Sequence, residues 1–133
     1  MTTRASGAFD VKLSALETYN NTDGAGLGHM SIDKQFHGDL DATSKGEMLS
    51  AMGSVKGSAG YVAIERVSGT LHGRSGSFVL QHNATMTRGQ PYLNIIVVPD
   101  SGSGELAGLT GTMNIVIADG KHSYEFDYAL SDG

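Results

Sequence analysis

The stretch YVAIERVSGTLHGRSGSFVLQH, residues 61–82, consists of two apolar segments on either side of a short turn that contains glycine. Apolar and polar side chains alternate in both segments, which is the pattern of β-strands with one buried face. A two-residue loop with Gly73 in first place, followed by Arg74, is typical of a type II′ hairpin turn. This turn predicts that the charged residue Glu65 lies opposite His82, both on the apolar face.

The same alternation continues along most of the 133 residues, and the 19 glycines fall between the short apolar segments. Sustained apolar spacing of three and four residues, the mark of an amphipathic helix, does not occur. The sequence therefore predicts an all-β domain with little helix. We expect eight strands near residues 8–19, 27–37, 42–52, 59–72, 75–87, 92–98, 109–118 and 121–130.

Two further turns indicate how the strands pair. Arg88-Gly89 predicts a hairpin that sets His82 against Ile95, and Asp119-Gly120 is a type I′ signal. Each hairpin then carries one apolar face. Eight antiparallel strands of this kind close most economically into a barrel, which leaves no free sheet edge. We expect one eight-stranded antiparallel β-barrel over residues 1–133, ordered over about 5–131, with a two-sheet sandwich as the alternative.

Composition excludes several functions. A net charge of -5 and a pI near 5.4 do not suit nucleic acid, because phosphate binding needs a basic face. The chain has no apolar stretch long enough for a membrane helix and no basic run for an anionic membrane surface. It has no cysteine, which fits a reducing compartment. We expect a cytoplasmic, soluble protein.

Three segments carry a resemblance: GSAGYVAIERVSGTLHGRSGSFVLQH, VVPDSGSGELAGLTGTMNI and DGKHSYEFDYAL. Together they resemble a bacterial family of uncharacterised small proteins, a domain of unknown function that is grouped by fold with the allene oxide cyclase-like barrels. The resemblance covers roughly residues 5–131 and implies the eight-stranded barrel. It implies no established activity, and no catalytic motif of the plant cyclases aligns with this chain.

Glu65 and His82 form the first candidate site. A carboxylate buried alone is costly, and a facing imidazole can hydrogen-bond to it or share its proton. Inside a barrel with little water the pair would have shifted pKa values. Three interpretations remain open: a structural pair that fixes the strand register, a pair that orients a ligand, or a catalytic acid–base pair.

Other candidates share the expected inner face. Tyr61, Tyr124 and Tyr128 can line a pocket or fill the core. Lys34 lies between apolar neighbours and can point inward to Glu65, although extension of its ammonium group to the barrel edge is favoured. The turn before the third strand permits either orientation, so Glu47 can face inward or outward.

A metal site is not expected, because His29, Asp33 and His37 follow one strand at intervals of about 13 Å, too far apart to share an ion. No nucleotide fingerprint or cofactor motif occurs. Tyr92, Ile96 and Val98 share an outer strand face and predict a homo-oligomer, with a dimer favoured. The leading functional hypothesis is a barrel that binds a small apolar ligand. The alternatives are an isomerase or cyclase, and a structural protein with a filled barrel.

Overall fold

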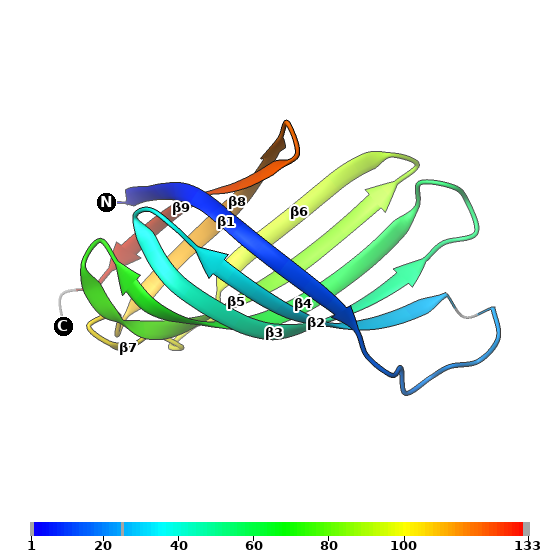
Figure 1. Ribbon diagram of the computed structural model, residues 1–133, viewed down its shortest axis with the longest axis horizontal. Coiled ribbons are helices and arrows are strands. Elements are labelled where there is room, and N and C mark those ends of the chain that lie inside the picture. Colours follow the sequence, from blue (N-terminus) through cyan, green and yellow to red (C-terminus); the bar gives the residue numbers. More distant parts are fainter. Residues whose placement is uncertain (1, 25, 132–133) are drawn as a thin grey trace.

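The chain folds into a closed antiparallel β-barrel, shown by a computed structural model that describes residues 2–24 and 26–131 (Figure 1). Eight long strands follow one another around the barrel, and pairing between β4 and β5 closes the circle. A ninth, two-residue strand adds to β5, and the described residues contain no helix. The barrel expected from the turns is confirmed, and the sandwich alternative is wrong. Of the domain predicted over residues 1–133, residues 1, 25, 132 and 133 lie outside the described part.

The strands begin and end close to their expected bounds, with the largest shift in the first strand, which was expected at residues 8–19. The strands are β1 (Thr3–Ala15), β2 (Leu27–Phe36), β3 (Leu40–Met52), β4 (Ala59–Leu71), β5 (Arg74–Thr87), β6 (Gln90–Val97), β7 (Ser103–Gly104), β8 (Leu109–Ala118) and β9 (Lys121–Leu130).

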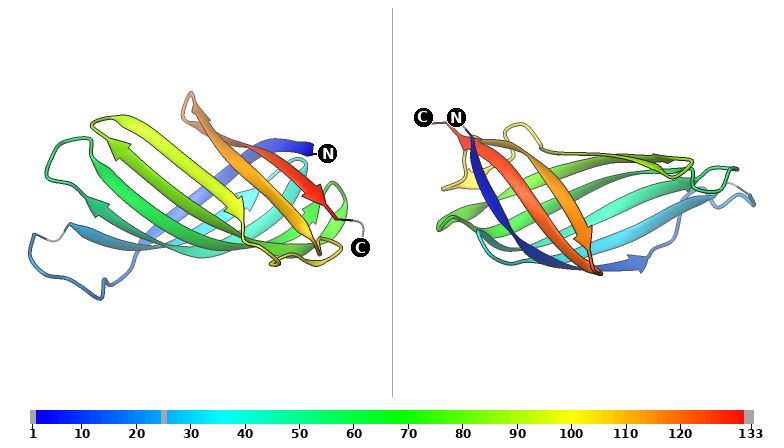
Figure 2. Two further views of the ribbon diagram at one scale, coloured as in Figure 1. Left: turned by 180° about the vertical axis from the view of Figure 1, so that it is seen from behind. Right: turned by 90° about the horizontal axis from the view of Figure 1, so that it is seen from above.

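The two ends of the barrel differ. At one end lie β7 and both chain termini, and Leu106 of the adjoining loop is buried there in the core (Figures 1 and 2). Phe36, Phe78 and Phe126 are fully buried, and the rings of Phe78 and Phe126 stack 5.7 Å apart. We call this the closed end, and the opposite end, which holds the β1–β2 and β3–β4 loops, the open end. Burial is incomplete at the open end, where Ile117 on the inner face is 66% exposed.

The β4–β5 turn corrects one expectation. The loop is His72-Gly73 rather than Gly73-Arg74, and both residues have positive φ, 46° and 80°, as a type I′ turn requires. Leu71 therefore pairs with Arg74, and the whole register moves by two residues. The prediction that Glu65 lies opposite His82 is wrong. A shift of two residues leaves every side chain on its expected face, since the period of a strand is two.

In the corrected register Glu65 pairs with Leu80, and His82 pairs with Ala63 one step nearer the open end. The other two hairpin registers are confirmed: His82 pairs with Ile95, and the β8–β9 ladder follows from Asp119-Gly120. The turns Arg88-Gly89 and Asp119-Gly120 each begin with a non-glycine residue that has a positive φ, as His72-Gly73 does.

The barrel is least tightly joined between β6 and β8. Only two residue pairs, Ile95 with Met113 and Ile96 with Thr112, connect these strands in the described part. In Figure 1 the β8–β9 hairpin diverges from β6 toward its tip.

Candidate functional site

A network of four polar side chains lies on the inner face of the barrel, at the level where the tightly packed core ends. Glu65 is completely buried, and its carboxylate accepts three hydrogen bonds. Lys34 Nζ and His82 Nε2 both donate to Oε2, at 2.8 and 2.5 Å, and Ser44 Oγ donates to Oε1 at 2.7 Å. The four residues come from β2, β3, β4 and β5, four consecutive strands of the wall. The sequence correctly predicted that Glu65 and His82 lie close together, although the strand register behind that prediction was wrong.

Lys34 reaches Glu65 because the strand between them carries small residues. Lys34 pairs with Ser44 of β3, and Gly46 pairs with Glu65. With no long side chain in the way, the lysine stem can cross β3 on the inner face. Only 6% of the Lys34 side chain is exposed. The favoured interpretation, that its ammonium group extends to the edge of the barrel, is therefore wrong.

The partners of Glu65 control its charge. Burial alone raises the pKa of this carboxyl, but the hydrogen bond from His82 and the positive charge of Lys34 outweigh that effect and lower the pKa to about 2. Glu65 is consequently ionised at neutral pH. An acid–base role near neutrality, one of the three interpretations of the sequence, does not suit this carboxylate.

The ionised carboxylate also determines which ring nitrogen of His82 carries the hydrogen. A carboxylate only accepts hydrogen bonds, so the hydrogen must lie on Nε2, which leaves Nδ1 as an acceptor in the neutral imidazole. Within the described part, no hydrogen bond reaches Nδ1, and every fully buried side-chain nitrogen or oxygen there has a partner. Nδ1 is therefore not fully buried and retains access to open space.

His82 lines a pocket of about 370 Å³ on the open side of the network. Its apolar walls come from β1, β2, β3, β4, β6 and β8, and Leu93 and Ile117 lie on either side of the weak β6–β8 seam. Four polar or aromatic side chains with hydrogen-bonding atoms also line it. The lining residues are Phe9, Val11, Leu13, Ile32, Lys34, Met48, Tyr61, Ala63, His82, Leu93, Ile115, Ile117 and His122.

Of the three candidate tyrosines, only Tyr61 lines this pocket. Burial, followed by the negative charge of Glu65, raises the pKa of Tyr61, so its hydroxyl stays protonated at neutral pH. Tyr124 instead donates a hydrogen bond to His37 O at 2.6 Å, and Tyr128 lies against His72 at the closed end. These two tyrosines hold turns at the closed end in place, away from the pocket.

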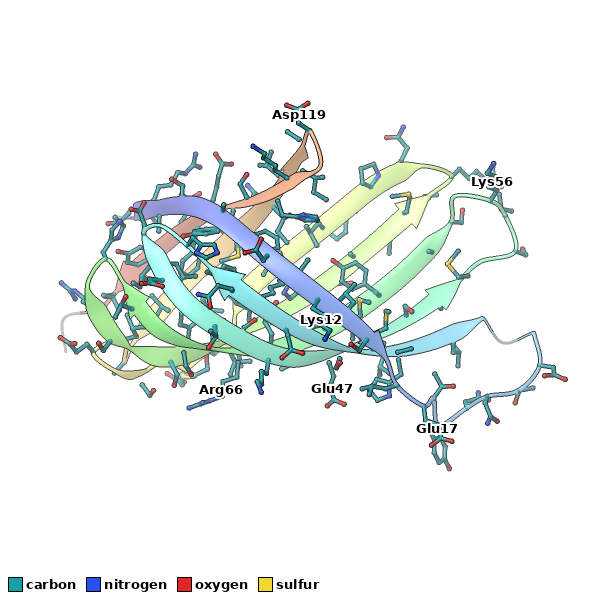
Figure 3. All side chains as sticks on the ribbon, viewed as in Figure 1. Lys12, Glu17, Glu47, Lys56, Arg66 and Asp119 are labelled. Carbon is teal, nitrogen blue, oxygen red and sulfur yellow. The ribbon has the colours of Figure 1, made fainter. Side chains whose placement is uncertain are left out.

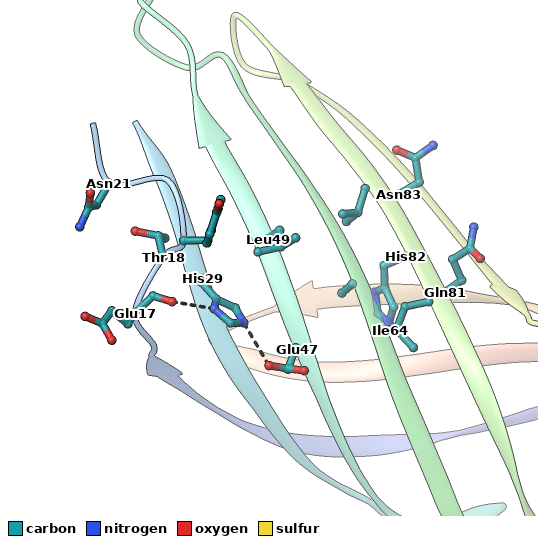
Figure 4. Close-up of a pocket in the computed structure, with 13 residues that line it drawn as sticks. Glu17, Thr18, Asn21, His29, Glu47, Leu49, Ile64, Gln81, His82 and Asn83 are labelled. Atoms are coloured by element: carbon teal, nitrogen blue, oxygen red, sulfur yellow. Dashed lines mark hydrogen bonds and ion pairs between the residues drawn. The ribbon is translucent and has the colours of Figure 1, made fainter. Parts of the chain in front are cut away.

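A second hollow lies on the outer surface, under the β1–β2 loop (Figure 4). His29 is held there between the carbonyl oxygen of Glu17 and the carboxylate of Glu47, at 3.0 and 3.1 Å. The orientation of Glu47, which the sequence left open, is thus outward, as Figure 3 also shows. Leu49, Val62 and Ile64 give this hollow an apolar floor.

No group of three or more His, Cys, Asp or Glu side chains in residues 2–24 and 26–131 is placed to hold a metal ion. The same part of the chain contains no helix of the length and apolarity needed to cross a membrane.

By fold and site, the molecule is a closed antiparallel β-barrel with a buried Lys–Glu–His network beside an apolar pocket. By sequence, residues 5–128 match the family described as "Protein of unknown function (DUF3224)", and the chain belongs to this family. The resemblance to a bacterial family of unknown function is confirmed at this level.

The chain is also similar to a solved structure, that of a protein with unknown function from the DUF3224 family from Shewanella oneidensis MR-1. The two share 55% sequence identity over 100% of both chains, with a TM-score of 0.95. The comparison with curated proteins finds no match. The two proteins thus share the same barrel, and the function has to be argued from the site.

Proposed function

We propose that the barrel binds a small, largely apolar molecule in the pocket at its open end. The observation that carries the proposal is an apolar pocket of about 370 Å³ into which Lys34, Tyr61 and His82 all face. Binding sites for small molecules typically have about 300–1,000 Å³, mostly apolar walls and a few polar groups that orient the ligand. Glu65 takes part indirectly, because it fixes the positions of Lys34 and His82.

The alternative of a structural protein with a filled barrel has less support. Aromatic and aliphatic side chains do fill the closed half, where the large buried residues gather. The open half differs, because the pocket there exceeds the roughly 100 Å³ below which an organic ligand finds no room. A protein that needs only a filled core gains nothing from leaving such a space beside a buried ion pair.

The isomerase or cyclase alternative follows from the sequence resemblance to the allene oxide cyclase-like barrels. A proton-transferring group in the pocket would be needed for such a reaction. Glu65 is unsuited, since its carboxylate is saturated with donors and its pKa is lowered to about 2. His82 Nδ1 is the only part of the network that could take a proton from a substrate, and ligand binding is the simpler use of the same geometry.

Two experiments test the proposal. Native mass spectrometry of the protein purified from its own host should show a retained small molecule. Titration of the purified protein with the neutral fluorophore N-phenyl-1-naphthylamine should show saturable binding. Ala63→Phe, which fills the pocket, should abolish that binding, whereas Val62→Phe, on the opposite face of the same strand, should not.

Leu93→Trp at the rim provides a second blocking variant if Ala63→Phe fails to fold. Circular dichroism checks the fold of each variant. Equal binding by the wild type and both folded blocking variants would show that the fluorophore binds elsewhere and would overturn the proposal.

A further inference from the structure

The polar groups at the floor of the pocket differ in their remaining capacity for hydrogen bonds. Lys34 Nζ uses one of its three N–H groups on Glu65 and lies 5.2 and 5.7 Å from the ring centroids of Phe9 and Phe36. Tyr61 brings a hydroxyl group that remains protonated at neutral pH. The neutral imidazole of His82, with its hydrogen on Nε2, offers Nδ1 as an acceptor. The floor thus presents two donors, Lys34 and Tyr61, together with one acceptor.

The charge of the floor is already balanced. Lys34 and Glu65 form a buried ion pair at 2.8 Å, with 6% and 0% of their side chains exposed. A ligand carboxylate would add a second negative charge close to Glu65, and a ligand ammonium group would add a second positive charge close to Lys34. Unbalanced charge is costly in a site that excludes water. The floor therefore favours an uncharged group.

A hydroxyl group is the uncharged group that uses both kinds of partner. Its hydrogen can be donated to His82 Nδ1 while its oxygen accepts from Lys34 Nζ or Tyr61 Oη. A ketone or an ether would leave Nδ1 without a donor, at the cost of an unsatisfied polar atom once the ligand excludes water. We propose that the natural ligand is an elongated, uncharged alcohol whose hydroxyl group lies against His82, with its hydrocarbon part toward the mouth.

The dimensions agree with this ligand class. A group the size of a water molecule occupies about 30 Å³. The pocket of about 370 Å³ therefore has room for about a dozen such groups, that is, about a dozen non-hydrogen atoms. A neighbouring hollow of about 350 Å³ shares Met48, Tyr61 and Leu93 with the pocket and continues toward the β3–β4 loop. A longer hydrocarbon chain can therefore extend outward while its hydroxyl group stays at the floor.

This inference rests on the proposed function, and its test separates the two. Displacement of bound N-phenyl-1-naphthylamine at pH 7.5 compares 1-decanol with methyl nonyl ether, an isomer that has the same atoms but no hydroxyl donor. Decanoate and decylamine serve as the charged counterparts of similar length. We expect 1-decanol to bind at least about fivefold more tightly than each of the other three, from one additional satisfied acceptor.

Two variants assign the effect to the floor. His82→Leu removes the Nδ1 acceptor and brings no other acceptor, while Lys34 and Ser44 still donate to Glu65, so the advantage of 1-decanol over the ether should disappear. Tyr61→Phe removes only a hydroxyl group and should weaken the binding of 1-decanol by at most a few-fold, because Lys34 can still donate a hydrogen bond to the alcohol. Circular dichroism and urea unfolding establish that both variants fold.

The outcomes point to different errors. Equal binding of the two isomers, or tighter binding of decanoate, would overturn the assignment of an alcohol while leaving ligand binding intact. An advantage of 1-decanol that persists in folded His82→Leu would overturn the role of Nδ1. Failure of the fluorophore itself to bind in the pocket would count against the proposed function instead.

Discussion

Lys34 and Glu65 form an ion pair across an intervening strand, with Nζ and Oε2 2.8 Å apart and both side chains shielded from solvent. Paired strands are about 4.8 Å apart, so the two side chains together bridge two such steps along the inner face of the barrel. The pair occupies the level at which the filled core gives way to the pocket. It therefore serves both the stability of the barrel and the polarity of the pocket floor.

Removal of Lys34 should leave Glu65 as a buried carboxylate with its main counter-charge lost. We expect Lys34→Met to lower the free energy of unfolding by about 3–5 kcal/mol, because breaking a buried pair strands the remaining charge. Lys12→Met, an exposed lysine on β1, should change it by no more than about 0.5 kcal/mol. Urea unfolding measures both, and equal effects would mean that the buried pair contributes nothing beyond a surface lysine.

Glu65 and His82 should be energetically coupled. Glu65→Gln and His82→Leu each remove one partner, so each should destabilise the protein, whereas the double variant should lose much less than the sum of the two. A coupling energy on the order of 1–3 kcal/mol is expected for a buried, charge-assisted hydrogen bond. Strictly additive losses of stability in urea would show that the contact has no energetic consequence.

Acid should remove the contribution of Glu65. Its pKa in the folded protein, about 2, lies below the ordinary value of 4.5 for a glutamate side chain. As pH falls, the unfolded chain therefore binds the proton first, and the stabilisation is present above about pH 4.5 and is lost as pH approaches 2. The difference in unfolding free energy between the wild type and Glu65→Gln should shrink over this range by roughly 3 kcal/mol. A difference that stays constant from pH 6 to pH 2.5 would contradict the lowered pKa.

The sequence predicted the inner and outer faces better than the exact pairing. Alternation and two turn signals were enough for the barrel and for the inward orientation of Glu65 and His82. The β4–β5 register was off by two residues, because His72 adopts a positive φ of 46° where glycine was expected to take that role. Tyr128, 56 residues away, contacts His72 Nδ1. A local turn rule cannot include a partner from the other end of the chain.

Lys34 was misjudged for a related reason. Its path to Glu65 depends on the inward orientation of Ser44, and the turn before β3 did not fix that orientation locally. In the structure Gly38 has a φ of 94°, and Tyr124 of β9 binds both Leu40 N and His37 O around this turn. A buried carboxylate requires a cation, however. Lys34 has apolar residues two positions away on both sides, and this pattern could have identified it as the cation that points inward.

Gly46 should be essential for the position of Glu65. A Cβ atom placed on Gly46 would lie 2.1 Å from Ile64 O and 2.6 Å from Glu65 Cα, both backbone atoms that cannot move without displacing β4. We expect Gly46→Ala to cost roughly 1–3 kcal/mol or more of unfolding free energy through overpacking. Gly60→Ala on β4 is the matched control, since its nearest contact would be an ordinary 3.6 Å. Similar stability of the two variants would contradict this close approach.

The outer surface supports a prediction about assembly. Tyr92, on the outer face of β6, is 56% exposed, and Ile96 and Val98 follow at alternate positions along the same chain segment. Across β5, the outer face of β4 adds Val62 and Ile64, which are 52% and 50% exposed. Apolar side chains grouped in this way on a surface mark interaction sites. We therefore propose that this face joins two copies of the chain into a homodimer.

Light scattering on the purified protein at micromolar concentration should then give about twice the monomer mass of 13.9 kDa. Tyr92→Glu places a charge on this face and should shift the mass to that of the monomer, because an unpaired charge is costly inside an interface. Ala8→Glu, at an exposed position on the outer face of β1, introduces the same charge three strands away from β6 and should leave the dimer intact. A wild-type mass of 13.9 kDa under these conditions would show that the face remains open to solvent. Dissociation by both substitutions would indicate that the interface extends over β1 or lies there instead.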